Sequence, residues 1–111
     1  MTITLTTTGR RSGMARDVRL YAYPDEERLV VVASWAGAEH DPQWAHNLRS
    51  NPRALVKQGS QTREVVAREV DGRERGRLWS LVTSAFPLYR TYQDRTERVI
   101  PLFVLSTDGH V

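Results

Sequence analysis

Glycine and arginine are concentrated near the N-terminus, in residues 6–13 with the sequence TTTGRRSG. Glycine permits positive φ and a close approach of backbone to ligand, and each arginine offers a planar fork that matches phosphate or carboxylate. Successive backbone N–H groups in such a loop can also converge on an anion. The segment lacks the Gly-x-x-x-x-Gly-Lys-Ser/Thr spacing of a phosphate loop. It therefore predicts an anion-binding loop and argues against nucleoside triphosphate hydrolysis.

Few other side chains suggest a reactive centre. The chain has no cysteine, which excludes disulfides, thiolate metal ligands and a cysteine nucleophile. His40, His46 and His110 are scattered without the spacing of metal ligands, and no Gly-x-Ser-x-Gly elbow occurs. We therefore expect no metal site and no acyl-transfer triad. Arg49 is expected to be a solvated charge.

The positive charge is unevenly distributed. The net charge is +3, and the first 20 residues hold four arginines against a single aspartate, Asp17. Such a cluster favours an anionic partner, either a cofactor tail, a nucleic acid or a membrane surface, with a solvated basic face as the alternative. Aromatic residues do not interleave with the arginines, which argues against nucleic acid. No apolar run approaches the ~20 residues that span a bilayer, and we expect a cytoplasmic protein.

Alternating and β-branched segments predict six strands, at residues 3–8, 18–23, 29–33, 53–58, 61–70 and 99–106. Residues 29–33 are apolar on both faces, which is typical of a buried central strand. A turn is expected at residues 24–27, and a tight turn at Gly59 should join the fourth and fifth strands into a hairpin. Pro101 favours an edge position or a bulge for the last strand.

Helices are predicted between these strands. Asp41 is expected to cap a helix that ends at residues 51–52, and Asp71 with Glu74 resembles a capping box for a second helix ending near Pro87. A short third helix should precede the last strand. Six strands with two or three flanking helices favour a mainly β (α+β) fold, an antiparallel barrel, in a single domain over residues 1–111.

Four segments in order carry a family resemblance: LTTTGRRSG (5–13), VVASWAGAEHDPQW (31–44), HNLRSNPRALVKQG (46–59) and FPLYRTYQDRTERVIPLFVL (86–105). Together they resemble the deazaflavin-dependent nitroreductase or quinone reductase family, which uses coenzyme F-420. One such segment alone would be weak, but four in order across nearly the whole chain are specific. The resemblance implies a split β-barrel related to the reductases that bind flavin mononucleotide (FMN).

The resemblance also implies a set of cofactor-binding residues. The basic loop and Arg16 match the segment that grips the phosphate and oligoglutamate tail, and Asn47 has a cofactor-side role on a helix where Trp44 packs into the core. The implied cofactor contacts are Thr8, Gly9, Arg10, Arg11, Ser12, Gly13, Arg16, Ala33, Ser34, Trp35, Gly37 and Asn47.

The resemblance also implies three catalytic residues. Ser34, with the backbone N–H groups of its turn, would polarise a ring carbonyl or a substrate oxygen, and Tyr89 and Tyr92 could each offer an O–H to the substrate. The local sequence also allows a turn-capping serine and tyrosines that pack on the barrel. Many family members carry lysine and a second glycine after the serine, whereas residues 35–36 are Trp-Ala here. Phe86 stands where a tyrosine could donate a proton.

The implied function is an F-420-dependent oxidoreductase that transfers a hydride from reduced deazaflavin to a quinone, nitroaromatic or enone. The alternatives are an FMN-binding split-barrel reductase, a cofactor-binding protein with little turnover, and a basic nucleic-acid-binding module. Family members usually carry an extension before the first strand, and this chain begins only a few residues ahead of it. We therefore expect a more open pocket, or one closed by the partner subunit of a homodimer.

Overall fold

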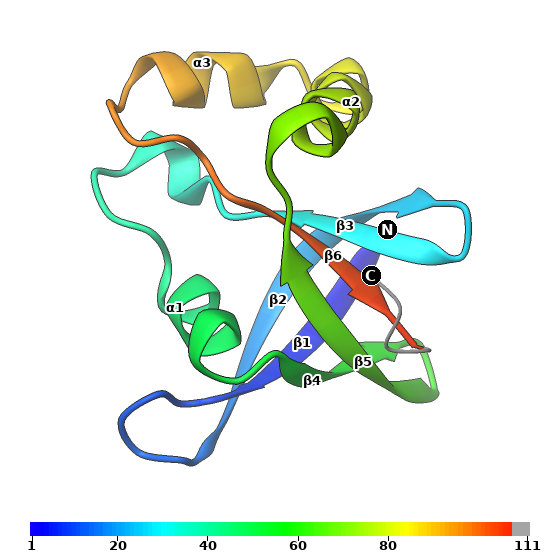
Figure 1. Ribbon diagram of the computed structural model, residues 1–111. Helices are drawn as coiled ribbons and strands as arrows, with labels where there is room; N and C mark the ends of the chain where they lie inside the picture. Colours follow the sequence, from blue (N-terminus) through cyan, green and yellow to red (C-terminus); the bar gives the residue numbers. More distant parts are fainter. Residues whose placement is uncertain (108–111) are drawn as a thin grey trace.

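The computed structural model describes residues 1–107, so His110 lies outside the described residues. Six strands form a closed antiparallel barrel in the order β1-β2-β3-β6-β5-β4, and β4 pairs with β1 to close it (Figure 1). The predicted six-stranded antiparallel barrel is confirmed. The strands are β1 (Thr2–Thr8), β2 (Ala15–Asp25), β3 (Arg28–Val32), β4 (Arg53–Gln58), β5 (Gln61–Glu69) and β6 (Leu102–Ser106).

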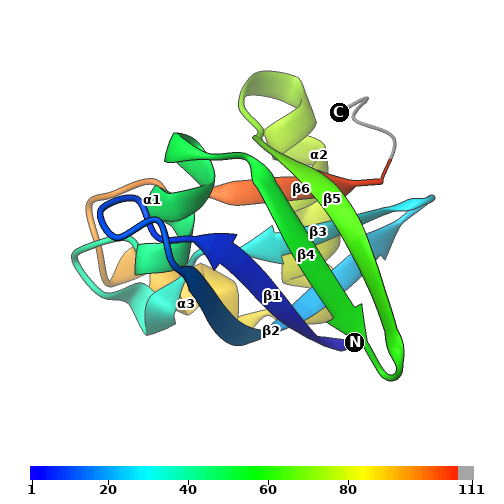
Figure 2. The ribbon, with the colours of Figure 1, turned by 90° about the horizontal axis from the view of Figure 1, so that it is seen from below.

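Helices cover one end and one side of the barrel. In Figure 1, α2 and α3 lie together over one end, with the short 3-10 helix η1 beneath α3. The helix α1 lies beside the loop between β1 and β2, and the view from below in Figure 2 agrees. These helices are η1 (Trp35–Gly37), α1 (Gln43–Ser50), α2 (Gly72–Ala85) and α3 (Leu88–Asp94).

The strand β3 separates two hydrophobic clusters. Val31 belongs to the cluster inside the barrel, where Trp44 of α1 packs on Phe103 of β6 with ring centroids 5.8 Å apart. Val30 and Val32 belong to the other cluster, which includes Leu78 and Val82 of α2 and Tyr89 of α3. Because successive side chains of a strand point to opposite faces, β3 is buried on both sides, as its apolar sequence predicts.

Both predicted helix caps differ from the structure. Asp41 does not cap α1, whose N-cap is Pro42, because its carboxylate accepts hydrogen bonds from Arg49 and Arg98. Asp71 occupies the N-cap of α2 but makes no capping bond, and Glu74 pairs with arginines instead. For Asp41 and Glu74, charge-assisted bonds to arginines replace the expected capping bonds to the helix backbone.

Two prolines do not take the positions that their sequence context predicts, which were an edge strand or bulge for Pro101 and a turn for Pro24. Pro101 precedes β6 without causing a bulge, and its carbonyl accepts the Ala33 N–H at 2.9 Å. Because β6 pairs with both β3 and β5, it is not an edge strand. Pro24 continues β2 opposite Leu29, so the turn to β3 consists of residues 26–27 alone.

Candidate functional site

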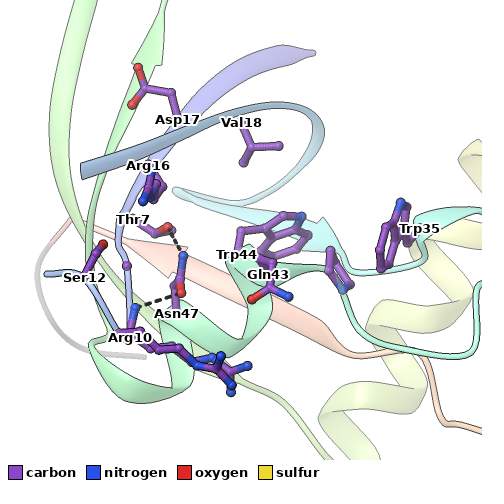
Figure 3. A pocket seen from close by; sticks show the side chains of 13 residues that line it. Thr7, Arg10, Ser12, Arg16, Asp17, Val18, Trp35, Gln43, Trp44 and Asn47 are labelled. Atoms are coloured by element: carbon purple, nitrogen blue, oxygen red, sulfur yellow. Dashed lines mark hydrogen bonds between the residues drawn. The ribbon is translucent and has the colours of Figure 1, made fainter. Parts of the chain in front are cut away.

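A cavity of about 680 Å³ opens where the β1–β2 loop meets α1 and η1 (Figure 3). We call it the basic cavity. It combines guanidinium groups with the edge of two indole rings, so it suits a ligand that is anionic and has an apolar part. Its lining residues are Thr7, Gly9, Arg10, Arg11, Ser12, Arg16, Asp17, Val18, Trp35, Pro42, Gln43, Trp44 and Asn47.

Its charge is predominantly positive. Arg10, Arg11 and Arg16 make no ion pair with any carboxylate in the part of the chain that the structure describes. The acidic lining residue, Asp17, accepts a hydrogen bond from the Thr6 hydroxyl at 2.7 Å, and Figure 3 shows its carboxylate pointing away from Asn47. Three exposed guanidinium groups on one cavity, with no carboxylate partner among residues 1–107, give it the charge that an anionic ligand requires.

The loop keeps its shape through its own backbone. The Gly9 N–H donates to the Met14 carbonyl and the Gly13 N–H to the Gly9 carbonyl, both at 2.8 Å. These two N–H groups are therefore bonded within the loop, and the predicted convergence on an anion falls to the other N–H groups. Gly13 has a φ of +71°, which favours glycine, and a Cβ on Gly9 would lie 2.6 Å from the Ser12 hydroxyl oxygen.

Asn47 fastens this loop to α1. The side chain is buried, its amide nitrogen donates to the Thr7 hydroxyl at 3.0 Å, and its oxygen accepts the Arg10 backbone N–H at 3.1 Å (Figure 3). Asn47 lines the basic cavity, as a cofactor-side role requires, but both ends of its amide are already bonded to the protein. These two hydrogen bonds position the loop relative to α1.

A second cavity of about 380 Å³ shares a wall with the first. We call it the aromatic cavity, because four of its lining residues are tryptophan or tyrosine. Flat apolar walls suit a planar ring. It is lined by Val18, Arg19, Leu20, Tyr21, Val32, Ser34, Trp35, Pro42, Trp44 and Tyr89, and the basic cavity shares Val18, Trp35, Pro42 and Trp44.

The predicted tyrosines take different positions. Tyr89 is buried at the aromatic cavity, and its hydroxyl lies 2.9 Å from that of Tyr23. Burial and the hydrogen bond with Tyr23 raise the pKa of Tyr89, so it keeps its proton at neutral pH. Tyr92 and Phe86 pack against the Tyr89 ring, at centroid distances of 6.3 Å and 4.9 Å, and neither lines a cavity described here. The tyrosine that the structure brings to the site is Tyr89.

Ser34 reaches the aromatic cavity from the end of β3. It occupies the N-cap of η1 without a side-chain capping bond, so the turn-capping alternative is wrong. The Gly37 N–H donates to the Ser34 carbonyl at 2.8 Å and is not available to polarise a ligand. Gly37 itself is buried, with Tyr92 above it, and the cavity linings do not include it.

The remaining predicted contacts lie further away. Thr8 and Gly13 line a separate groove beside β4 and β5, and Ala33 is fully buried in the barrel. Arg49 is not a free charge, since it pairs with Asp41 and Glu69. Within residues 1–107 no group of His, Asp and Glu could hold a metal ion. Nor does the described part of the chain contain a helix long and apolar enough to cross a membrane.

Sequence reasoning missed several site residues. Thr7 and Gln43 line the basic cavity beside residues that the loop motif did indicate, and Tyr23 supports Tyr89 from β2. Arg98 holds the turn that carries Ser34. Arg98 lies within the last family-like segment, and this position was the one sign in the sequence that it belongs to the site. Its charge gave no sign, because charge alone does not distinguish a buried arginine from a solvated one.

This fold and these two cavities define a split-barrel protein with a site for a ligand that is anionic at one end and planar at the other. The chain belongs to the F420H(2)-dependent quinone reductase family, whose profile matches residues 1–107. The resemblance noted from four sequence segments is thereby confirmed.

Individual relatives agree with this assignment. F420H(2)-dependent quinone reductase Rv1261c of Mycobacterium tuberculosis is 34% identical over 105 residues, which cover 92% of this chain and 70% of the relative. The solved F420-H2 dependent reductase FDR-A is 36% identical, with a TM-score of 0.85 over 95% of this chain and 93% of that one. A solved domain-swapped dimer is also 36% identical, with a TM-score of 0.86 over 95% of this chain and 79% of the other.

Proposed function

We propose that this protein is a quinone reductase that uses reduced coenzyme F420 as its hydride donor. The observation that carries the proposal is that the two cavities adjoin along shared residues: three unpaired guanidinium groups line the first, and the second has aromatic walls. A deazaflavin with a phosphate and oligoglutamate tail combines the same two properties. Family membership supports this choice of cofactor.

The residues present fit that cofactor. Arg10, Arg11 and Arg16 would hold the charged tail through charge-assisted hydrogen bonds, and Ser12 adds a hydroxyl on the same cavity. Trp35 and Trp44 form the wall where the two cavities meet. Asn47 orders the loop that carries the arginines, which lowers the entropy lost when a ligand binds.

Reduced F420, when bound, supplies the hydride. A quinone that gains a hydride also needs a proton for its reduced oxygen, and Tyr89, which lines the aromatic cavity, carries a hydroxyl that is protonated at neutral pH. When Tyr89 gives up this proton, the Tyr23 O–H can donate to the phenolate oxygen across their 2.9 Å contact. Ser34 offers a second hydroxyl at the same cavity.

The central test removes the charge from the basic loop. We expect R10A/R11A to bind F420 at least about tenfold more weakly for each arginine, since a hydrogen bond to a charged group contributes roughly 1.5–3 kcal/mol. The matched control is R63A/R73A, which removes two exposed arginines outside the basic cavity and lowers the net charge equally. Affinity is measured by titration of cofactor fluorescence, and turnover with menadione as acceptor.

Each outcome of this test is decisive. Equal affinity in both double variants removes the arginines from the proposal, and a wild-type protein that neither binds nor oxidises reduced F420 overturns the function. Parallel titration with FMN separates the flavin alternative, because FMN has a phosphate but no oligoglutamate tail. Binding of F420 without turnover on menadione indicates a cofactor-binding protein.

We also propose a homodimer in the cytoplasm. The domain-swapped dimer among the similar solved structures supports self-association, and a homologous swap would bring a second chain close to the barrel. Sedimentation velocity over a range of protein concentrations tests whether the protein is a dimer, and a monomer at every concentration contradicts it.

Cell fractionation tests the cytoplasmic location. Recovery of the protein in the membrane pellet would contradict that location.

A further inference from the structure

Arg98 is the most highly bonded side chain near the site. It lies between α3 and β6, and its side chain is only 13% exposed. The guanidinium donates to the carbonyls of Ala38 at 2.7 Å, Ala33 at 3.1 Å and Ser34 at 2.7 Å, and to the Asp41 carboxylate at 2.8 Å. One side chain therefore binds both ends of the turn from β3 to α1.

That turn has a strained backbone. Trp35 and Ala36 are consecutive non-glycine residues with φ of 42° and 52°, in the left-handed region that L-residues rarely adopt. Such conformations persist only where the surroundings hold them. Gly37 adds a second constraint, because a Cβ there would lie 2.6 Å from the Tyr92 carbonyl oxygen. The turn is therefore held both by the hydrogen bonds of Arg98 and by the close approach of α3 to Gly37.

The same turn shapes both cavities. Trp35 lines each of them with 57% of its surface exposed, and Ser34 lines the aromatic one. Arg98 donates to the backbone carbonyl of Ser34 and not to its hydroxyl. Any effect of Arg98 on a ligand must therefore pass through the conformation of the turn.

We propose that Arg98 is a positioning residue that holds the strained Ser34–Trp35 turn in its ligand-binding conformation. The role of Arg98 in holding the turn does not depend on which ligand binds. The effect of Arg98 on catalysis rests on the proposed function. Asp41 extends the effect, since it bridges Arg98 to Arg49, which pairs in turn with Glu69 of β5. Arginine is required because its planar fork reaches several acceptors at once, whereas lysine has one nitrogen on a flexible stem.

The test observes Trp35 directly. The chain has three tryptophans, so protein labelled with 5-fluorotryptophan should give three fluorine resonances, and W35F assigns the one of interest. In R98K we expect the Trp35 resonance to shift or split, while that of Trp79 on α2 stays in place. The matched control is R77K, which disturbs a different arginine–carboxylate pair, with Asp25, and should leave the Trp35 resonance unchanged.

Binding and kinetics complete the test. With Trp35 displaced, R98K should bind F420 about tenfold more weakly and raise the KM for quinone more than it lowers kcat. If R98K does not fold, D41N replaces it, because this variant removes the carboxylate charge that faces Arg98 and Arg49 and leaves the three backbone carbonyl acceptors of Arg98 in place. A Trp35 resonance unchanged in the folded variant overturns the proposal. A shifted resonance in a protein whose wild type binds no F420 supports the role of Arg98 and overturns only the proposed function.

Discussion

The Arg10 backbone N–H donates to the side-chain oxygen of Asn47, so the basic loop is tied to α1 across 37 residues of sequence. The amide nitrogen of Asn47 donates in turn to Thr7, at the end of β1. Asn47 thus bonds both to the loop and to the strand that leads into it, whereas the other loop contacts are hydrogen bonds within the loop itself. The loop that we propose to bind the cofactor tail is thus already ordered by contacts within the protein.

We expect Asn47→Ala to weaken F420 binding about tenfold, because the loop must then be ordered at the expense of binding free energy. The variant should also lose roughly 1–3 kcal/mol of stability, since Thr7 is buried and loses its partner. Calorimetric titration and urea unfolding measure the two effects. Ser50→Ala, exposed at the end of the same helix, is the control. Full affinity in Asn47→Ala would contradict the positioning role.

The tyrosines should separate in kinetics. Tyr89→Phe removes the hydroxyl at the aromatic cavity and should lower kcat about a hundredfold, the scale of a lost general acid, with little change in F420 affinity. Tyr23→Phe should have a smaller effect, because it removes only the partner hydroxyl. Tyr92→Phe serves as the control, since Tyr92 does not line either cavity. A Tyr92→Phe defect equal to that of Tyr89→Phe would move the proton donor to Tyr92.

Acid stability should depend on Asp25. Hydrogen bonds from Arg77 and Arg28 hold the pKa of this buried carboxyl at about 2, below its ordinary value of 3.8. A lowered folded pKa stabilises the protein above the ordinary pKa, and this contribution, about 2 kcal/mol, is lost as pH falls from 3.8 through 2. Asp25→Asn should reduce that loss in unfolding measured between pH 5 and pH 2. Asp94→Asn, which changes an exposed carboxylate, should leave it intact.

Two glycines with similar φ should respond differently to alanine. Gly37 and Gly59 have φ of +78° and +60°, but only at Gly37 would a Cβ meet other atoms, 2.6 Å from the Tyr92 carbonyl oxygen. Gly59→Ala should cost about 1–2 kcal/mol of stability from backbone strain alone. Gly37→Ala should cost more and should weaken F420 binding. Equal losses by thermal unfolding would show that α3 does not press on the turn.

We further propose that residues 1–111 form a single domain. Two-state unfolding is usual for domains of this size, so the far-ultraviolet circular dichroism and the tryptophan fluorescence should lose their native signals in one coincident transition. The β3–β6 pairing joins the first half of the chain to the second directly. Two separate transitions would indicate that α2 and α3 unfold independently of the barrel.

The sequence by itself predicted the strands, and it supplied the arginine cluster on which the proposed anion site rests. Alternation along 53–58 and 61–70 with Gly59 between them predicts the hairpin that β4 and β5 form, because side-chain period and turn chemistry are local properties. The cluster of Arg10, Arg11 and Arg16 predicted an anion site for a similar reason: like charges that are close in sequence remain close in space.

Only the tertiary structure decided what the polar side chains bind. Asp41 and Asp71 have the local pattern of helix caps, but Asp41 binds Arg98, 57 residues away, and Asp71 makes no capping bond. Asn47 proved to be bonded at both ends, and Tyr89 rather than Tyr92 reached the aromatic cavity. Such outcomes depend on which distant partner the closed barrel brings within about 3 Å, and hydrogen bonds act only at that range. Local sequence therefore predicts the elements, whereas contacts between distant segments complete the site.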